Sequence, residues 1–113
     1  MKSRDRQILA KILEEAEVAF ELIEGMELEQ FLADERTRRA VSMTLINIGE
    51  LVKNLTPPFK DAHPQVPWKA MATLRNVAAH KYQTLRMEDV WDTVVLDLPR
   101  IYHDIQRMAN HAK

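Results

Sequence analysis

The segment from Arg75 to Tyr82, which reads Arg-Asn-Val-Ala-Ala-His-Lys-Tyr, holds the side chains best suited to chemistry. Arg75 carries a planar guanidinium that is always charged and can hold an anion. His80 is the one side chain of the segment that titrates near neutral pH, so it could move protons. If these two side chains meet, they could combine proton transfer with the stabilisation of negative charge.

Each of these residues also has an ordinary structural explanation. Arg75 falls on an apolar, alanine-lined face of a predicted helix, where a guanidinium must pair with an acid, reach water along its stem, or face a pocket. Glu50 is a candidate carboxylate for a bridging ion pair. His80 could cap a helix or lie at the surface, and Tyr82 could be a core or rim aromatic with a wet hydroxyl. The small residues around Arg75, alanines 72, 78 and 79, instead favour an opening for a ligand or another chain.

The spacing of Arg75 and His80 decides how they could cooperate. Five positions correspond to roughly 140° around a straight helix, so the two side chains would diverge. They meet only if the helix ends near Ala79 and the next residues fold back, or if two copies of the segment face each other across a two-fold axis. Asn76, four residues before His80, shares one polar strip with it. The segment is therefore interpreted as half of a site that a second chain completes.

The elements before this segment are predicted from apolar residues at three- and four-residue spacing. One helix is expected over Ile8–Ile23 with Gly25 as its C-cap, followed by a short connecting turn or helix over Leu28–Ala33. Asp34 is a suitable N-cap for a second long helix that ends before Pro57 and Pro58. The proline-rich stretch Thr56–Val66 is expected to be a stiff loop.

A third and a fourth long helix follow. Pro67 suits the first position of a helix from Trp68 to about Ala79, and another begins at about Met87. Pro99 lies inside the fourth helix and predicts a kink with the hydrogen bond toward Val95 lost. Nothing in the chain reads as a strand or a repeat. The predicted fold is all-α, a bundle of four main helices plus a short connecting helix, in a single domain over residues 1–113.

The overall charge of the chain gives it no general attraction for nucleic acid. The chain has 16 basic and 17 acidic residues, a net charge of −1, so any RNA contact depends on a local patch. Basic residues gather in two groups, for which a solvated helix face is the alternative. The groups are Arg36, Arg38 and Arg39, and Lys69, Arg75, Lys81 and Arg86.

Several classes of protein are not expected. The chain has no cysteine, its four histidines lack metal-ligand spacing, and its two glycines form no phosphate loop, so we expect neither a metal nor a cofactor. No apolar run reaches the length of a signal peptide or a membrane span. A cytoplasmic protein without membrane contact is expected.

The pattern Arg75, four residues, His80, one residue, Tyr82 resembles the signature of HEPN-type ribonucleases, and more narrowly of the HepT toxins of prokaryotic toxin–antitoxin modules. The flanking residues also look like that family: Asn76, Pro67-Trp68, Ile48-Gly49-Glu50 and Asp97-Leu98-Pro99. Lys81 departs from the pattern, because many relatives are expected to carry an acidic residue there. A lysine at this position could contact phosphate.

The resemblance implies a HEPN-like homodimer with both motif segments in one cleft, acting as a metal-independent endoribonuclease on transfer RNA or messenger RNA. In such an enzyme the ribose 2′-hydroxyl attacks the adjacent phosphorus, His80 moves protons and Arg75 stabilises the phosphorane. Asn76 could orient His80 or a phosphate oxygen.

The same resemblance implies regulation by a partner. Tyr82 corresponds to the residue that an MntA-like nucleotidyltransferase antitoxin modifies with AMP, which would block the cleft and repel RNA. Two other functions stay open. One is a non-catalytic HEPN module that partners a nucleotidyltransferase and binds nucleotide. The other is a plain helical assembly domain in which Arg75 forms a buried structural ion pair.

Overall fold

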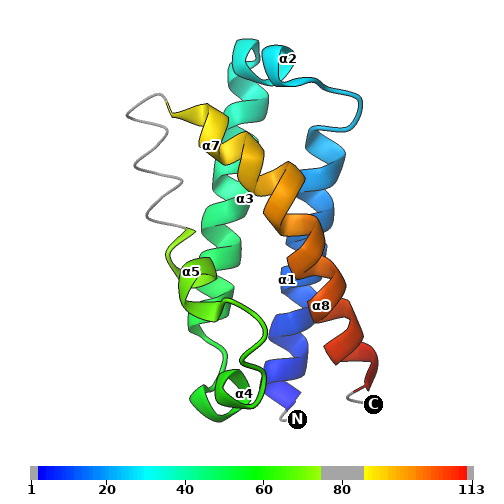
Figure 1. The fold of residues 1–113 in the computed structure, drawn as a ribbon, viewed down its shortest axis with the longest axis vertical. Helices are drawn as coiled ribbons and strands as arrows, with labels where there is room; N and C mark the ends of the chain where they lie inside the picture. Colours follow the sequence, from blue (N-terminus) through cyan, green and yellow to red (C-terminus); the bar gives the residue numbers. More distant parts are fainter. Residues whose placement is uncertain (1–2, 75–85, 112–113) are drawn as a thin grey trace.

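The computed structural model describes residues 3–74 and 86–111, and within these ranges it contains helices, turns and connecting segments but no strand (Figure 1). The predicted all-α class is therefore confirmed for the described part of the chain. The elements in chain order are α1 (Ser3–Leu22), α2 (Leu28–Ala33), α3 (Glu35–Lys53), α4 (Pro57–Ala62), α5 (Trp68–Ala72), α7 (Met87–Asp92), η1 (Thr93–Asp97) and α8 (Leu98–His111).

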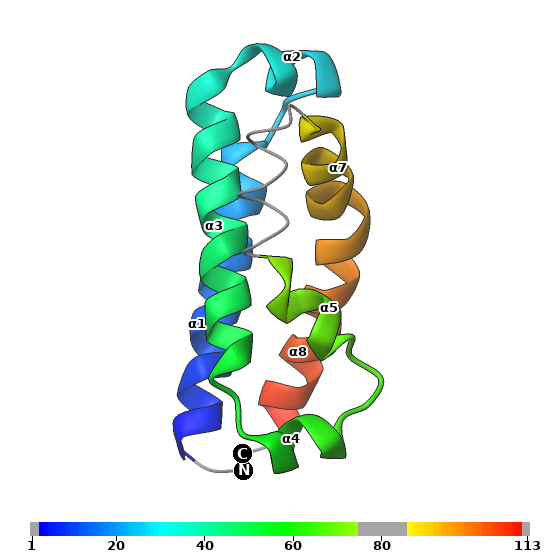
Figure 2. The same cartoon turned by 90° about the vertical axis from the view of Figure 1, so that its left-hand side faces the viewer.

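The two longest helices, α1 and α3, run antiparallel and pack against each other, with α2 connecting them at one end (Figures 1 and 2). α7, η1 and α8 follow one another as a continuous rod, in which α7 packs on α2 and α8 packs on α1. α5 packs on α3. α4 lies at the end opposite α2, where α1 begins and α8 ends.

The apolar stripes predicted from the sequence meet in one core. α1, α3 and the α7–η1–α8 rod together supply most of it. Burying each such aliphatic side chain contributes about 1.5–3 kcal/mol relative to leaving it exposed. Among the most buried side chains are Leu9, Ile12, Phe31, Val41, Leu45, Ile48, Val52, Met71, Val90, Val94, Leu98 and Ile105.

Two predicted helix boundaries are confirmed. Gly25 has a φ of 77°, the left-handed conformation that lets the chain leave α1 after Leu22. Asp34 caps α3, since its carboxylate accepts from the Thr37 amide at 3.2 Å and from the Thr37 hydroxyl at 2.9 Å. These hydrogen bonds to Thr37 hold the pKa of Asp34 below its ordinary value.

The expectation of a loop over Thr56–Val66 is wrong in its first half, where α4 forms. Pro57 and Pro58 occupy the first positions of this helix, where an amide would have no intrahelical partner. From the sequence, these prolines were expected only to end the preceding helix. Asp5 fixes the start of α4 to α1, because its buried carboxylate accepts from the Thr56 amide at 2.9 Å and from the Thr56 hydroxyl at 2.7 Å.

The helix expected from Trp68 to about Ala79 is interrupted. α5 ends at Ala72, and Thr73 is its C-cap, with its hydroxyl donating to the Ala70 carbonyl at 2.7 Å. Pro67 is the N-cap of α5 and not its first residue. The angle of roughly 140° between Arg75 and His80 concerns residues outside the described ranges and stays a prediction.

The irregularity expected near Pro99 is present, but as a π-helical turn before the proline. η1 spans Thr93–Asp97, and the Leu98 amide donates to the Thr93 carbonyl five residues earlier. Pro99 itself is helical, in the first turn of α8. The wider turn accommodates the missing proline amide without ending the rod.

Candidate functional site

The predicted site residues Arg75, Asn76, His80, Lys81 and Tyr82 lie outside the described residues. Their mutual arrangement stays a prediction, and the alternative in which Arg75 pairs with Glu50 stays open. The described residues establish the two anchors between which the segment 75–85 runs. The first is α5 with Leu74, and the second is Arg86 with α7.

The first anchor is held by Trp68, whose side chain is 7% exposed. Its indole nitrogen donates to the His63 carbonyl at 2.9 Å, and its ring lies 5.9 Å from the ring of Phe59, centroid to centroid. Met71, one turn later, is fully buried in the core. The last helical turn before Leu74 is thus fixed by both hydrogen bonding and burial.

The second anchor is held by Met87, which is buried at the start of α7. The Ser42 hydroxyl on α3 lies 4.0 Å from the Met87 sulfur, a weak hydrogen bond in the core. Trp91, one turn later, packs on Phe31 with ring centroids 5.2 Å apart. Since α5 also packs on α3, the residues on both sides of the segment 75–85 are positioned by the same helix.

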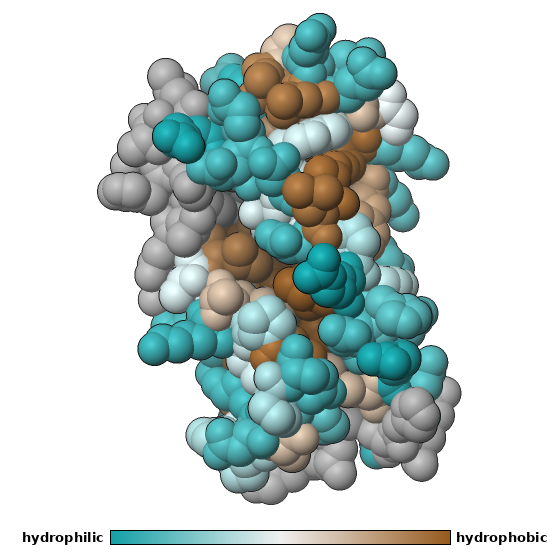
Figure 3. All heavy atoms as spheres, viewed as in Figure 1, coloured by the Kyte–Doolittle hydropathy of each residue, from teal (hydrophilic) through white to brown (hydrophobic). Residues whose placement is uncertain are grey.

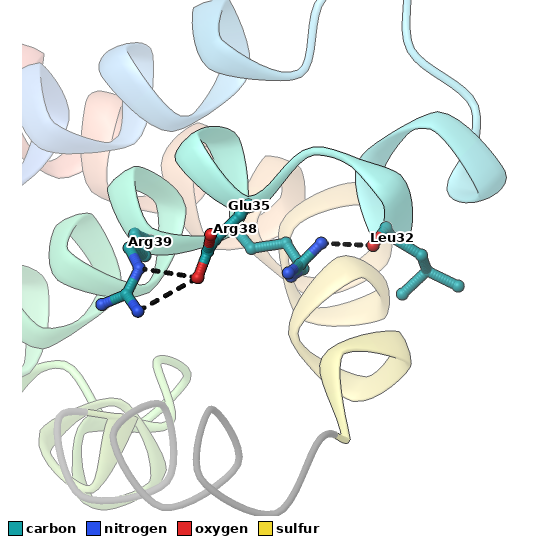
Figure 4. A network of polar contacts seen from close by, with 4 residues as sticks. All are labelled: Leu32, Glu35, Arg38 and Arg39. Carbon is teal, nitrogen blue, oxygen red and sulfur yellow. Dashed lines mark hydrogen bonds and ion pairs between the residues drawn. The ribbon is translucent and has the colours of Figure 1, made fainter.

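The basic group at the start of α3 has structural partners. Arg38 donates to the Leu32 carbonyl at the end of α2, and Arg39 pairs with Glu35 at 3.1 Å (Figure 4). The Arg39 and Glu35 side chains are 64% and 62% exposed, as expected of a solvated ion pair. The exposed pair supports the solvated-face interpretation for Arg39, whereas Arg38 is half-buried and ties α3 to the end of α2.

A groove of about 360 Å³ separates α5 from η1 and α8. Figure 3 shows apolar surface on this face of the molecule, interspersed with polar side chains. Leu74, which lines the groove, directly precedes Arg75. The lining residues on α5 and just around it are Gln65, Pro67, Ala70, Met71 and Leu74, and those on the rod are Thr93, Asp97, Leu98, Arg100, Ile101 and Asp104.

This groove was not predicted from the sequence, where Asp97 stood out only as part of the Asp97-Leu98-Pro99 flank that looks like the HEPN family. The sequence did contain a signal for a polar wall. Polar residues recur at helical spacing along one line of the rod, at Thr93, Asp97, Arg100 and Asp104.

The described residues contain neither a metal-ligand cluster nor a helix that could span a membrane. Within residues 3–74 and 86–111, no three histidine, aspartate or glutamate side chains are grouped so that they could hold a metal ion. In the same ranges, none of the helices combines the length and the apolar character needed to cross a membrane.

Comparison with known proteins decides the family. The family model described as Ribonuclease HepT-like matches residues 12–108, which include every predicted site residue. The chain belongs to the HepT-like ribonuclease family. The resemblance of the motif to this family is therefore confirmed. At the level of the family, so is the predicted enzyme class, a ribonuclease.

Individual HepT-like relatives match over most of their length. A protein of Methanocaldococcus jannaschii named "Putative RNase MJ0127" is 38% identical over 91% of this chain and 85% of its own. A protein of Thermococcus cleftensis named "Probable ribonuclease HepT" is 33% identical over 96% of this chain and 98% of its own. "Putative RNase TTE0752" of Caldanaerobacter subterraneus is 32% identical over 96% of both chains. No solved structure matches the chain significantly.

Proposed function

We propose that this HepT-like protein is the metal-independent endoribonuclease toxin of a prokaryotic toxin–antitoxin system. Arg75 and His80 cleave RNA in a site formed where two copies of the chain meet. The observation that carries the proposal is the family match over residues 12–108, with Arg75, His80 and Tyr82 at the motif spacing inside it.

The proposed reaction needs no group beyond side chains. One His80 takes the proton from the ribose 2′-hydroxyl as its oxygen bonds to the adjacent phosphorus. The bond from phosphorus to the 5′-oxygen then breaks, and the second His80 of the dimer protonates that oxygen. Arg75 stabilises the extra negative charge of the phosphorane, and Asn76 orients His80 or a phosphate oxygen. The products are a 2′,3′-cyclic phosphate and a free 5′-hydroxyl.

Two features support a site shared between chains, one in the described residues and one in the sequence. The residues on both sides of the segment 75–85 are positioned by the same helix, α3. The whole chain is also close to neutral, so two copies of Arg75 and Lys81 in one cleft would supply the local positive charge that RNA binding requires.

The test is cleavage of transfer RNA and messenger RNA by the purified protein in excess chelator. We expect cleavage by the wild type and loss of at least about a hundredfold in rate for His80→Ala and for Arg75→Ala. His103→Ala on α8 and Arg4→Ala on α1 are matched controls, because both side chains are exposed and neither lies in the motif. Full cleavage by both motif variants would contradict the proposal.

We also propose that a nucleotidyltransferase antitoxin silences the enzyme through Tyr82. The Tyr82 hydroxyl oxygen attacks the α-phosphorus of ATP, forms a phosphodiester to AMP and releases pyrophosphate. The bound adenylate adds bulk and negative charge at the cleft, and both oppose RNA binding.

The chain's two tyrosines make this second proposal simple to test. After incubation with an MntA-like nucleotidyltransferase and ATP, we expect one added AMP per chain by mass spectrometry and loss of RNA cleavage. Tyr82→Phe should block the modification, whereas Tyr102→Phe should not. The alternative, a non-catalytic module, predicts nucleotide or partner binding with RNA left intact.

A further inference from the structure

We propose that the groove between α5 and the η1–α8 rod binds one base of the RNA substrate and prefers a base that carries an exocyclic amino group. This inference rests on the proposed RNA cleavage and adds a source of sequence preference to it.

The position of the groove connects it to the proposed catalytic residues. Leu74 forms part of its wall, and the next residue in the chain is Arg75. The wall of the groove is therefore one residue along the chain from the proposed catalytic arginine. RNA held at Arg75 by a phosphate could therefore place a neighbouring base in the groove.

The size and walls of the groove suit a base. Its volume of about 360 Å³ lies in the range of small-molecule sites, in which apolar walls surround a few polar groups. Pro67, Leu74 and Ile101 supply apolar surface on opposite sides, against which a flat ring can pack.

The charges of the groove favour a neutral ligand with hydrogen-bond donors. Asp104 is paired with Arg107 at 3.2 Å, whereas Asp97 and Arg100 are exposed and form no ion pair with any described residue. The charges of Asp97 and Arg100 offset each other, so the groove offers a phosphate no net electrostatic attraction. An exocyclic amino group would donate to that carboxylate, as cytosine N4 does to acidic side chains in nucleic-acid complexes. Adenine, cytosine and guanine carry such a group, and uracil does not.

The π-helical turn η1 brings two of the polar groups to this wall. It begins at Thr93 and ends at Asp97, and both residues line the groove. The Thr93 hydroxyl donates its proton to the Asp89 carbonyl at 2.9 Å, so toward the groove its oxygen can only accept. The Asp97 carboxylate and the Thr93 hydroxyl oxygen are thus two hydrogen-bond acceptors on one wall, and they suit a ligand whose edge carries hydrogen-bond donors. π-turns are frequent at functional sites.

The test compares the bases next to the cut in a pool of random-sequence RNA cleaved by the full-length protein. We expect the wild type to disfavour uracil at one position by roughly tenfold, from the discrimination that one good base contact provides. Asp97→Asn should weaken this discrimination, because the amide can also donate to uracil. Asp92→Asn, an exposed aspartate on α7 of the same rod, is the control and should keep it.

A binding measurement separates this inference from the proposed function. Titration with cytidine and uridine monophosphates needs no cleavage, and we expect tighter binding of cytidine monophosphate that Asp97→Asn weakens. Ala70→Trp fills the groove from α5 and should abolish the difference, with its folding checked by circular dichroism. If RNA is cleaved but Asp97→Asn leaves base preference and nucleotide binding unchanged, the subsite is refuted and the proposed function stands. If no RNA is cleaved but the nucleotide difference holds, the proposed function fails and the binding site remains.

Discussion

The indole nitrogen of Trp68 donates a hydrogen bond to the backbone carbonyl of His63 at 2.9 Å and ties the first residue of α5 to the end of α4. Trp68→Phe keeps an aromatic ring in the core but removes the indole donor, so this carbonyl retains only the hydrogen bond from the Val66 amide at 3.3 Å. We expect a loss of about 1–2 kcal/mol in the free energy of unfolding. Urea denaturation followed by circular dichroism measures it, and an unchanged midpoint would show that the hydrogen bond contributes nothing.

Asp5 should be the most sensitive polar position of the core among the described residues. Its side chain is 2% exposed and accepts two hydrogen bonds from Thr56, which join α1 to α4. Asp5→Ala removes both bonds and should cost about 2–4 kcal/mol of unfolding free energy. Asp61→Ala, at an exposed position of α4, is the matched control and should change stability little. Equal effects of the two substitutions would contradict this role.

The Asp34 cap predicts acid sensitivity of α3. The hydrogen bonds from Thr37 lower the pKa of Asp34 in the folded state, so its contribution is present at neutral pH. That contribution is lost as the pH falls from the unfolded-state pKa through the folded one. The difference in Tm between wild type and Asp34→Ala should therefore be largest near neutral pH and shrink toward pH 3. A difference that grows on acidification would exclude this account.

For Tyr102 we expect stability to be lost at high pH, the opposite of the dependence expected for Asp34. Its hydroxyl donates to a Glu17 carboxylate oxygen at 2.8 Å, and this hydrogen bond raises the pKa of Tyr102. The stabilisation is complete below the unfolded-state pKa and is lost as the pH rises through the folded one. Tyrosinate absorbance should show a late-titrating component that Tyr102→Phe removes and Glu17→Gln shifts to lower pH. Persistence of that component in Tyr102→Phe would assign it elsewhere.

Local signals in the sequence predicted much of the fold. Gly25 and Asp34 act through their own backbone conformation or hydrogen bonds to residues a few positions away, so their roles as boundaries could be inferred from residue type. The stripe of Val41, Leu45 and Ile48 followed from helical periodicity.

Features that depend on competing or distant contacts were missed. Pro57 can end one helix or begin another, and the Asp5 carboxylate far away in the sequence contributes to the second outcome. The break at Thr73 and the π-turn before Pro99 change which residues share a face, so angular counting across them fails. The groove beside Leu74 could likewise be found only from the structure, because its two walls come from residues about 20–40 positions apart in the sequence.

If Arg75 and His80 cleave RNA without a metal, the chemical nature of the product ends reveals it. Wild type and His80→Ala are incubated with transfer RNA in excess chelator, and the ends of the fragments are determined. The account predicts 2′,3′-cyclic phosphate and 5′-hydroxyl ends from the wild type and no fragments from His80→Ala. Fragments with 5′-phosphate ends, or equal cleavage by His80→Ala, would contradict it.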